Sequence, residues 1–539
     1  MDVDPRLRST GGRGLTRRDL LRVAGATAGV AFVAACTPQT TPPGIPTPGV
    51  TRPPTSKLLW GAGNSVARLD PQTSATFTDL AMFDNLFDTL TARRPPPNHR
   101  ELQPRLATEW SLVNDTTWQF KLRSDVKFHN GQQLTAADVK FTMERAIDPN
   151  SRSIWRSAFS TVSRVDVIDD FTVNFVTMAF DPLLPNRLIG QGSWVMPAQY
   201  FQEVGEDGFE RAPIGSGPYK FLEHVTGDHT FVAANADYWD GAPAVEGIEL
   251  RAIPEISARV TALTSTEESN FSESIPSDQV DGVREGATTK VEELLYSGNY
   301  SLTPNTATPP LDKREIRQAL SLAIDRESII NNLLRGEGAI PNGVTPPGDF
   351  AYDEAVPPLP YDPQRARDLL RQAGYQNEEV LLETTRNFLI QQDQALGEAL
   401  VQMWRDVGIN ARLELLETSV RTQKIGQRAF QGLFTAAFSS YLQDPAGFMW
   451  RILQQDGPLN YGWVNDEFQR LGLEAGSSTD PDLRTRNYRR MNEIVREEVP
   501  FIAVMEFYQF FGMKQYVNFK PGPNTILNFR RDNLNFTGL

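Results

Sequence analysis

Cysteine and histidine are scarce in this sequence of 539 residues, which holds one cysteine and four histidines. The single cysteine, Cys36, cannot form a disulfide bond within the chain. One cysteine cannot supply a zinc finger, and no two histidines stand four residues apart as the HExxH pattern of zinc hydrolases requires. We therefore expect no metal site and no cofactor.

Other signatures of function are also missing. No run of about 18 apolar residues follows the N-terminal segment, so no internal membrane span is expected. The phosphate-binding patterns GxxxxGK[ST] and GxGxxG do not occur, nor does the serine-hydrolase pattern GxSxG. The net charge of −14 argues against nucleic acid or an anionic membrane surface as the main partner.

What is present is typical of a soluble globular protein, with 40% hydrophobic and 22% charged residues. A chain of this length is too long for one hydrophobic core, so we expect two or more domains. Strand signals alternate with helix signals along the chain, which predicts the α/β class.

The first 35 residues have the layout of an export signal. Arg17 and Arg18 precede an apolar run over residues 23–35, a pattern typical of a twin-arginine signal peptide. The run ends in Val-Ala-Ala directly before Cys36, which resembles a lipoprotein cleavage box, so we predict that Cys36 is lipidated. The alternative is an unmodified cysteine in a signal that is simply removed. Residues 36–56 are rich in proline and threonine and predict an extended tether.

The folded chain opens with short elements. Residues 57–60 predict a strand that ends at the glycines that follow, and residues 79–90 predict a helix. Thr135 and Asp138 have the spacing of a capping box at the start of another helix. His129 belongs to a turn and is expected to be structural. Further on, Gly215 and Gly217 flank a serine and are expected to permit a tight turn.

The stretch over residues 300–334 begins as a strand and enters a long helix. Asp312 is the predicted N-cap, and Glu315 three residues later completes a capping-box pattern. Apolar residues recur at helical spacing and predict one buried stripe. The stripe consists of Ile316, Ala319, Leu320, Ala323 and Ile324.

Three further helices and a strand are expected in the last third. Asp362 caps a helix with Pro363 in its first turn and Gly374 as its stop. Helices are also predicted over residues 395–407 and 486–499. The apolar and aromatic run over residues 501–511 predicts a buried strand that returns the chain to its first domain.

Several of these stretches together resemble one family. The run NTATPPLDKREIRQALSLAIDRESII, LQPRLATEW, the turn IGSGPY and the run NADYWDG are similar to segments of extracellular solute-binding proteins of family 5. These are the binding proteins of ABC importers for oligopeptides, dipeptides and nickel. The resemblance covers residues 58–524. It departs near residues 265–270, where family members usually carry Gly-Glu-Val-Asp.

The resemblance implies the two-lobed periplasmic-binding-protein fold of the large peptide-binding type, with an inserted subdomain in the first lobe. The lobes are expected to close on a hinge around a cleft. The expected parts are the signal peptide (1–35), the tether (36–56), the first part of lobe I (57–92), the inserted subdomain (93–196), the second part of lobe I (197–298), lobe II (299–505) and the C-terminal return to lobe I (506–539).

The implied function is that of a receptor, without catalysis. The protein would capture a peptide-like solute and deliver it to a membrane permease and its ATPase. We expect a monomer, held at the outer face of the cytoplasmic membrane or in the periplasm and touching the membrane only through its lipid anchor. Alternatives are the same role for a neutral oligosaccharide or another non-peptide ligand, and a sensor that keeps the fold without a transporter. An extracellular hydrolase is a further class that no compact motif supports.

The ligand contacts depart from the family pattern. Peptide-binding members place an aspartate three residues before an Asp-Pro pair, where it binds the α-amino group of the ligand. Asp444 and Pro445 are present here, but Tyr441 occupies the amine-binding position, and no Lys or Arg occurs over residues 429–450. Because a buried ammonium without a carboxylate partner is costly, we predict that residue 441 does not hold a free α-amino group.

Aromatic residues gather around the same stretch of sequence. Tyr441, Tyr461 and Trp463 would form a pocket suited to stacking on sugars or flat apolar ligands. The alternative is that they belong to the hydrophobic core. The full set of candidate ligand-binding residues is Tyr441, Leu442, Asp444, Asn460, Tyr461, Trp463, Phe77 and Thr78.

Overall fold

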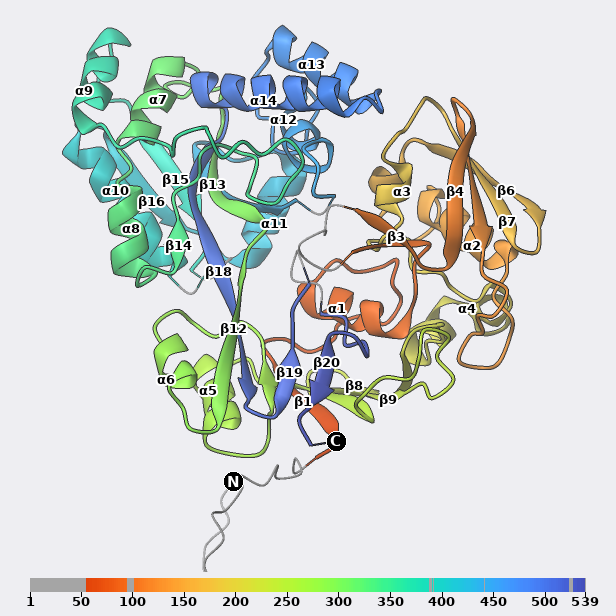
Figure 1. The fold of residues 1–539 in the computed structure, drawn as a ribbon. Coiled ribbons are helices and arrows are strands. Elements are labelled where there is room, and N and C mark those ends of the chain that lie inside the picture. The colour runs from red at the N-terminus through yellow and green to blue at the C-terminus, as the bar shows by residue number, and fades with distance from the viewer. Residues whose placement is uncertain are drawn as a thin grey trace, which may run out of the picture. The chain divides into compact units, whose positions relative to one another are not determined.

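The computed structural model describes residues 55–94, 101–386, 390, 392–440, 442–522 and 527–538 (Figure 1). The predicted signal peptide, Cys36 and Tyr441 lie outside these ranges, as does the tether up to residue 54. Within the described ranges, none of the helices is both long and apolar enough to cross a membrane.

One long strand, β18 (Ile502–Lys514), runs through the middle of a mixed sheet and belongs to both of its halves (Figure 1). Near its start, β18 pairs antiparallel with β13 (Gly298–Pro304). Further along, it pairs with β12 (Thr289–Leu295) and β11 (Phe271–Ser272). We call the part on the β11 side the first lobe and the part on the β13 side the second lobe. β18 is the strand that the apolar run over residues 501–511 predicted.

The first lobe is built on parallel strands at its centre and antiparallel strands at its edge. β1 pairs parallel with β10 and with β11, and β10, β9 and β8 follow in antiparallel order. Its further elements are β1 (Lys57–Ala62), β8 (Tyr219–Val225), β9 (His229–Ala234), β10 (Gly247–Ala252), β19 (Val517–Phe519), β20 (Leu534–Phe536), α1 (Phe77–Leu86), α5 (Ile256–Thr264) and α6 (Val280–Arg284). Its core packs Trp60, Phe83 and Phe271 with aromatic residues that follow β18.

A separate antiparallel sheet lies within the sequence of the first lobe, in the order β4-β5-β7-β6. Its core is distinct and includes Phe120, Phe159 and Phe175. The elements of this region are β2 (Thr91–Arg93), β3 (Leu102–Pro104), β4 (Ala107–Asn114), β5 (Thr117–Leu122), β6 (Val162–Asp169), β7 (Thr172–Thr177), α2 (Ala136–Ile147), α3 (Leu184–Arg187) and a 3₁₀ turn at Arg156–Phe159. The next helix, α4 (Ala198–Arg211), packs Phe209 into the core of the first lobe.

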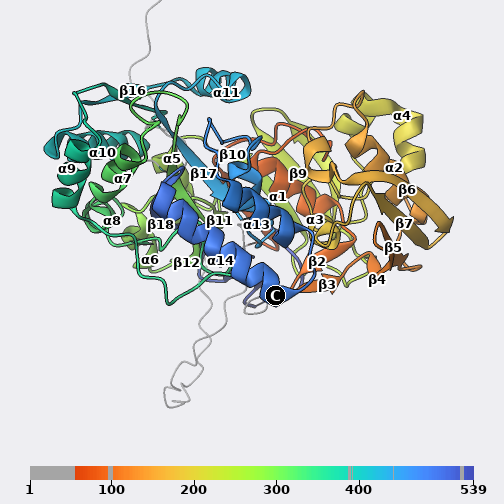
Figure 2. The ribbon, with the colours of Figure 1, turned by 90° about the horizontal axis from the view of Figure 1, so that it is seen from above.

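The second lobe continues the large sheet in the order β16-β15-β17-β13. β15 is parallel to both β16 and β17. Figure 2 shows α13 lying along α14 over this part of the sheet. The elements are β14 (Gly338–Ala339), β15 (Val380–Thr384), β16 (Ala411–Leu415), β17 (Leu433–Ser439), α7 (Arg314–Leu322), α8 (Arg326–Leu333), α9 (Pro363–Gln372), α10 (Asp393–Asp406), α11 (Thr418–Gln427), α12 (Arg451–Leu453), α13 (Asp466–Gly476), α14 (Pro481–Glu498) and a π-helical turn at Ala446–Trp450.

The prediction of one long helix after residue 312 is wrong in two respects. The segment is divided into α7 and α8, and the N-cap of α7 is Lys313, with no side-chain cap from Asp312. The break has a physical cause. The Asp325 carboxylate accepts a hydrogen bond from the Ser328 N–H and starts α8. Arg326, only 1% exposed, donates to the carbonyl of Ala503 on β18 and so ties the corner to the sheet.

The role of Gly215 and Gly217 also differs from the prediction. Neither glycine has a positive φ, so the need for glycine at these positions does not come from the conformation of a tight turn. A Cβ on Gly215 would lie 1.9 Å from the Leu86 carbonyl oxygen, and one on Gly217 would also meet the backbone at the end of α1. The His129 ring accepts from the Gly215 N–H and donates to the Gly217 carbonyl, so His129 is structural as expected.

Other local predictions hold with shifted ends. Thr135 and Asp138 form the capping box of α2, and Asp362 caps α9 with Pro363 in the first turn. α1 lies at residues 77–86 rather than 79–90, and β1 continues two residues beyond 60. α14 starts at Pro481, five residues before the predicted start, because Asp480 caps it through the Asp482 and Leu483 N–H groups.

Candidate functional site

The candidate site lies where the lobes face each other beside the crossing strands. In the second lobe, the parallel strands β15, β16 and β17 end toward this region, and ligands of α/β sheets bind at the carboxyl ends of such strands. The Arg93 guanidinium, from β2, donates to the carbonyl of Leu442, just beyond β17. Leu183, which precedes α3, packs into a second-lobe cluster with Phe448 and Met449. Residues far apart in sequence thus meet at this edge.

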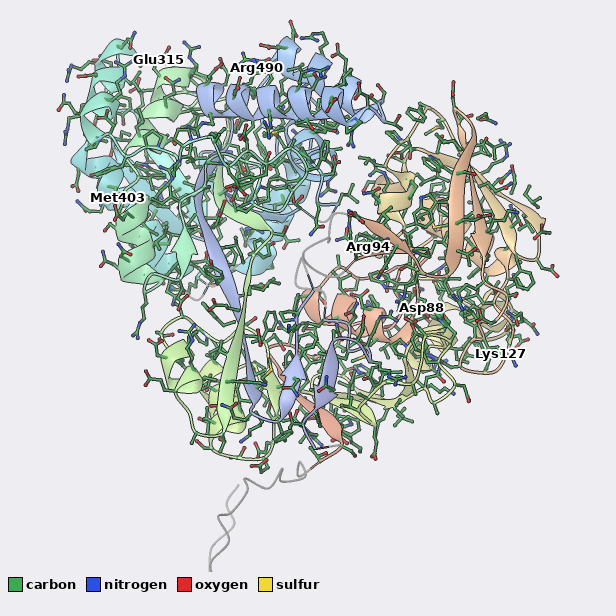
Figure 3. The ribbon with its side chains drawn as sticks, in the orientation of Figure 1. Asp88, Arg94, Lys127, Glu315, Met403 and Arg490 are labelled. Atoms are coloured by element: carbon green, nitrogen blue, oxygen red, sulfur yellow. The ribbon has the colours of Figure 1, made fainter. Side chains whose placement is uncertain are left out.

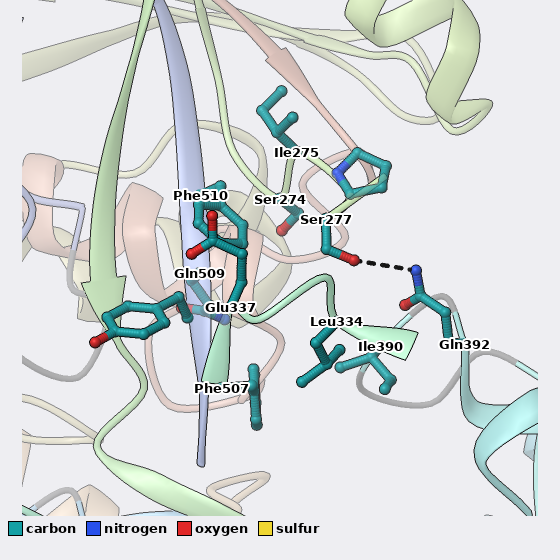
Figure 4. Close-up of a pocket in the computed structure, with 12 residues that line it drawn as sticks. Ser274, Ile275, Ser277, Leu334, Glu337, Ile390, Gln392, Phe507, Gln509 and Phe510 are labelled. Carbon is teal, nitrogen blue, oxygen red and sulfur yellow. Dashed lines mark hydrogen bonds between the residues drawn. The ribbon is translucent and has the colours of Figure 1, made fainter. Parts of the chain in front are cut away.

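A cavity of about 100 Å³ lies beside the crossing strand (Figure 4). Residues 274–277, which follow β11, line it from the first lobe, and residues 507–510 of β18 form its wall. Gln392, at the start of α10, donates to the Ser277 hydroxyl over 3.3 Å, and this bond joins the lobes. Glu337 also lines the cavity and pairs with Arg284 at 3.3 Å.

Two of the predicted ligand residues have all their polar contacts inside the second lobe. The Asp444 carboxylate accepts from Arg484 of α14 at 2.7 Å, and both side chains are buried. The Asn460 amide donates to the Leu453 and Trp463 carbonyls and accepts from the Trp463 N–H. These two side chains hold the surrounding loops in place.

Tyr461 and Trp463 lie in one aromatic cluster. Tyr461 packs edge-on against Phe434 of β17 at 5.1 Å, and the guanidinium of Arg428 lies 5.3 Å from its ring. Trp463 packs edge-on against Phe468 at 5.0 Å. Burial raises the pKa of Tyr461. Among the described residues, neither the Tyr461 hydroxyl nor the Trp463 indole nitrogen has a hydrogen-bond partner. Both polar atoms are buried in the structure.

The remaining candidates are divided between the lobes. Phe77 and Thr78 form the first turn of α1 in the first lobe, where Phe77 packs against the core and Thr78 is buried. Leu442 is in the second lobe and offers its carbonyl to Arg93. Tyr441 lies outside the described residues, so its placement beside Tyr461 and Trp463 stays a prediction.

Sequence reasoning missed a set of basic side chains at the ends of the second-lobe strands. Arg386 follows β15 directly, is exposed and donates to Gln394 of α10 at 2.5 Å. Arg421, on α11 after β16, donates to the Thr435 carbonyl, and burial lowers its pKa. The search for basic residues over 429–450 was too narrow. The available signal was an arginine directly after a strand, because the parallel strands β15 and β17 end at the same edge of the sheet.

Acidic groups near this edge are mostly paired. Glu383, the fourth residue of β15, forms an ion pair with Lys424 of α11 and accepts from the Gln431 N–H. Asp393 accepts from the Tyr300 hydroxyl at 2.5 Å. Burial raises the pKa of Tyr300 well above its ordinary value. Within the described chain, no group of three or more acidic, histidine or cysteine side chains is arranged to hold a metal ion.

Comparison with known proteins shows which family and which proteins the chain resembles. The profile described as "Bacterial extracellular solute-binding proteins, family 5 Middle" matches residues 101–459. The chain is 25% identical over 506 residues to di/tripeptide-binding protein 1 of Pseudomonas aeruginosa strain UCBPP-PA14, covering 88% of this chain and 93% of that protein. It is 25% identical over 446 residues to heme-binding protein A of Haemophilus influenzae, covering 75% and 79%.

Solved structures show the same fold. The chain superposes on the periplasmic binding protein DppA of Helicobacter pylori, determined in complex with the peptide STSA, with a TM-score of 0.78 and 21% sequence identity. The match covers 89% of this chain and 98% of the other. The two-lobed fold of the large peptide-binding type, expected from the sequence, is therefore confirmed.

Proposed function

Because the chain belongs to the bacterial extracellular solute-binding proteins of family 5, and so is the exported binding component of an ABC importer, we propose that its ligand is a short peptide held between the lobes. The observation that carries this proposal is the pair of arginines Arg386, which follows β15, and Arg421, on α11 after β16. A guanidinium matches the planar carboxylate at a peptide C-terminus. Relatives named for di- and tripeptides support the same class.

The first test identifies the ligand directly. Protein purified from its native host is denatured, and the released small molecules are measured by mass spectrometry. Peptides of a few residues support the proposal, whereas a sugar or a porphyrin contradicts it.

A second test addresses the carboxylate anchor. Calorimetry compares trialanine with its C-terminal amide on the wild type and on Arg386→Gln. A hydrogen bond to a charged group is worth about 1.5–3 kcal/mol, so the variant should bind trialanine roughly ten- to a hundred-fold more weakly. Arg365→Gln, on the exposed side of α9, is the matched control and should bind like the wild type. Equal binding of the peptide and its amide by the wild type would remove Arg386 from this role.

The second candidate is a neutral oligosaccharide or another non-peptide ligand. Among the described residues, the Tyr461 hydroxyl and the Trp463 indole nitrogen lack hydrogen-bond partners, which favours such a ligand because aromatic rings with polar ends suit sugar hydroxyls. No arrangement among the residues that the structure describes favours catalysis over this receptor role. A role as a sensor without a transporter is decided by whether a permease and an ATPase are encoded beside the gene.

We also propose that the mature protein is a lipid-anchored monomer after twin-arginine export, with lipid on Cys36 and the lobe boundaries given above. The Arg17-Arg18 pair and the Val-Ala-Ala-Cys box support the anchor. Replacing Cys36 by serine should release the protein from the membrane fraction. A variant that stays as membrane-bound as the parent contradicts lipidation.

A further inference from the structure

The large sheet is interrupted along one edge of β18, at the point where the chain crosses between the lobes. β12 and β13 follow each other along the first edge of this strand. On the other edge, β14 pairs with residues 506–507 and β11 pairs with residues 512–513. The Ile275 N–H donates to the Phe510 carbonyl. The interruption is therefore at residues 508–509, and the cavity beside the crossing strand lies there (Figure 4).

The walls of this cavity come from both lobes and are largely apolar. Ile275 belongs to the first lobe, whereas Leu334 directly follows α8 and Ile390 precedes α10 in the second lobe. Phe507 and Phe510 of β18 complete the apolar wall. A molecule in the cavity therefore contacts both lobes at once.

The cavity is separate from the aromatic residues of the candidate solute site. Leu433 and Phe434 are neighbours on β17, and consecutive side chains of a strand project to opposite faces of the sheet. Leu433 packs in the core that contains Phe507, whereas Phe434 packs in the cluster that contains Tyr461 and Trp463. The cavity thus borders the other face of the second-lobe sheet. The candidate ligand residues that the structure describes are not part of its lining, nor are the two arginines of the proposed function.

The charge of the lining favours an uncharged molecule. Among the twelve lining residues, Glu337 is the one that carries a charge at neutral pH, and Arg284 pairs with it at 3.3 Å. A charged ligand would leave water without a free counter-charge, which is costly. The Ser277 hydroxyl accepts from Gln392, and its own hydrogen has no acceptor among the described residues. The lining therefore offers one hydrogen-bond donor within apolar walls.

We propose that this cavity is a second binding site, for a small uncharged molecule that has an apolar body and one hydrogen-bond acceptor. Its volume of about 100 Å³ is smaller than the roughly 150 Å³ of a cavity that holds benzene, so about four to six non-hydrogen atoms fit. The molecule accepts from Ser277 and contacts Ile275 and Ile390, and it thereby links the lobes at the hinge. This inference goes beyond the proposed function and does not depend on the identity of the solute.

The test uses the full-length protein with tetrahydrofuran and pyrrolidine as probes. The two rings are equal in size, but tetrahydrofuran is a neutral acceptor, whereas pyrrolidine is a cation at pH 7. The isoleucine δ1 methyl groups are isotopically labelled and observed by NMR. Tetrahydrofuran should shift the signals of Ile275 and Ile390 with one shared Kd, on the order of 1 mM. Ile316, in the second-lobe core, should not respond. Pyrrolidine should bind about ten-fold more weakly, because its charge loses water.

A variant and its control locate the site independently. Ser277→Leu fills the cavity and removes the hydroxyl, so tetrahydrofuran should no longer shift Ile390. Ser257→Leu changes an exposed serine of α5 and should leave binding as in the wild type. The inference is overturned by unchanged Ile275 and Ile390 signals at tens of millimolar probe, by tighter binding of pyrrolidine, or by binding that survives in Ser277→Leu.

The methyl shifts are measured on the wild type, so the result does not rest on the folding of any variant. No peptide is present in these titrations. Failure of the second site therefore leaves the proposed peptide function standing, and failure of trialanine binding leaves the second site standing.

Discussion

At the scale of single residues, the carboxylate of Asp88 joins three separate parts of the first lobe. It is 1% exposed and lies just after α1 (Figure 3). It accepts from Arg105 and from Arg530 at 3.2 Å each, and from the Tyr238 hydroxyl at 2.8 Å. The groups come from the region after β3, the C-terminal tail and the loop before β10. One acid therefore holds segments that are far apart in the chain.

Replacing Asp88 by alanine should lower the free energy of unfolding by about 3–5 kcal/mol, because two buried guanidinium groups lose their counter-charge. Urea unfolding measures this. Asp240→Ala is the matched control: Asp240 also pairs with Arg105, but its side chain is 51% exposed, so its loss should cost less than about 1 kcal/mol. Similar losses for the two variants would show that Asp88 acts as an ordinary surface ion pair.

Glu506 makes stability depend on pH with a definite sign. Its pKa is about 7 in the folded protein against 4.5 ordinarily, so between these values the folded protein keeps a proton that the unfolded chain has lost. Stability therefore falls as the pH rises from below 4.5 to above 7, by up to about 3 kcal/mol. Burial also raises the pKa of Asp84 to about 7, which adds a trend of the same sign.

The difference between wild type and Glu506→Gln isolates the Glu506 contribution. Unfolding free energies at pH 5 and pH 8 should show that the wild type loses about 3 kcal/mol more than the variant over this interval, while Asp84 affects both proteins alike. Parallel pH dependences of the two proteins would mean that the Glu506 carboxyl is solvated and titrates normally.

At the scale of elements, the glycines after α4 set how closely α1 can approach the neighbouring loop. A methyl group on Gly215 would meet the Leu86 carbonyl oxygen at 1.9 Å, and backbone cannot move aside as a flexible side chain would. Gly215→Ala should therefore destabilise the protein by about 3 kcal/mol in urea unfolding. Gly426→Ala, in α11 with open space around it, should instead stabilise by about 0.5–1 kcal/mol. A neutral Gly215→Ala would show that the contact relaxes.

Sequence patterns predicted correctly those helix starts that depend only on residues close together in the sequence. The caps at Thr135 and Asp362 depend on residues within three positions, and both were found from spacing alone. The break between α7 and α8 depends on a contact between Arg326 and Ala503, which lies 177 residues away, and no helical pattern contains that information. The candidate site divides in the same way: the aromatic residues near the Asp-Pro pair are candidates from the sequence alone and their binding role stays a prediction, whereas Arg386 becomes a candidate only once β15 is known to end at the same edge as β17.

At the scale of the whole molecule, two segments of the described chain cross between the lobes. Residues 296–298 lead from β12 into β13, and β18 returns beside them, with the Tyr296 N–H bonded to the Phe507 carbonyl at 2.9 Å. Tyr296 and Phe507 also stack with ring centres 4.8 Å apart. Such a short pair of crossings can bend while each lobe keeps its own core, which is the arrangement that hinge closure requires.

Ligand binding should therefore change the size of the molecule in solution. The wild type carrying a ligand recovered from its native host should show a smaller radius of gyration by small-angle scattering than the ligand-free protein, because solvent leaves the space between the lobes. The contacts Arg93 to Leu442 and Gln392 to Ser277 join the lobes in the structure, so Gln392→Ala should shift the ligand-free protein toward the larger radius.

Binding should also stabilise the fold by RT ln(1 + [L]/Kd), about 2.7 kcal/mol at a hundred-fold excess over Kd. An unchanged radius together with full stabilisation would mean that the ligand enters lobes that are already closed, and hinge motion would then have to occur without ligand.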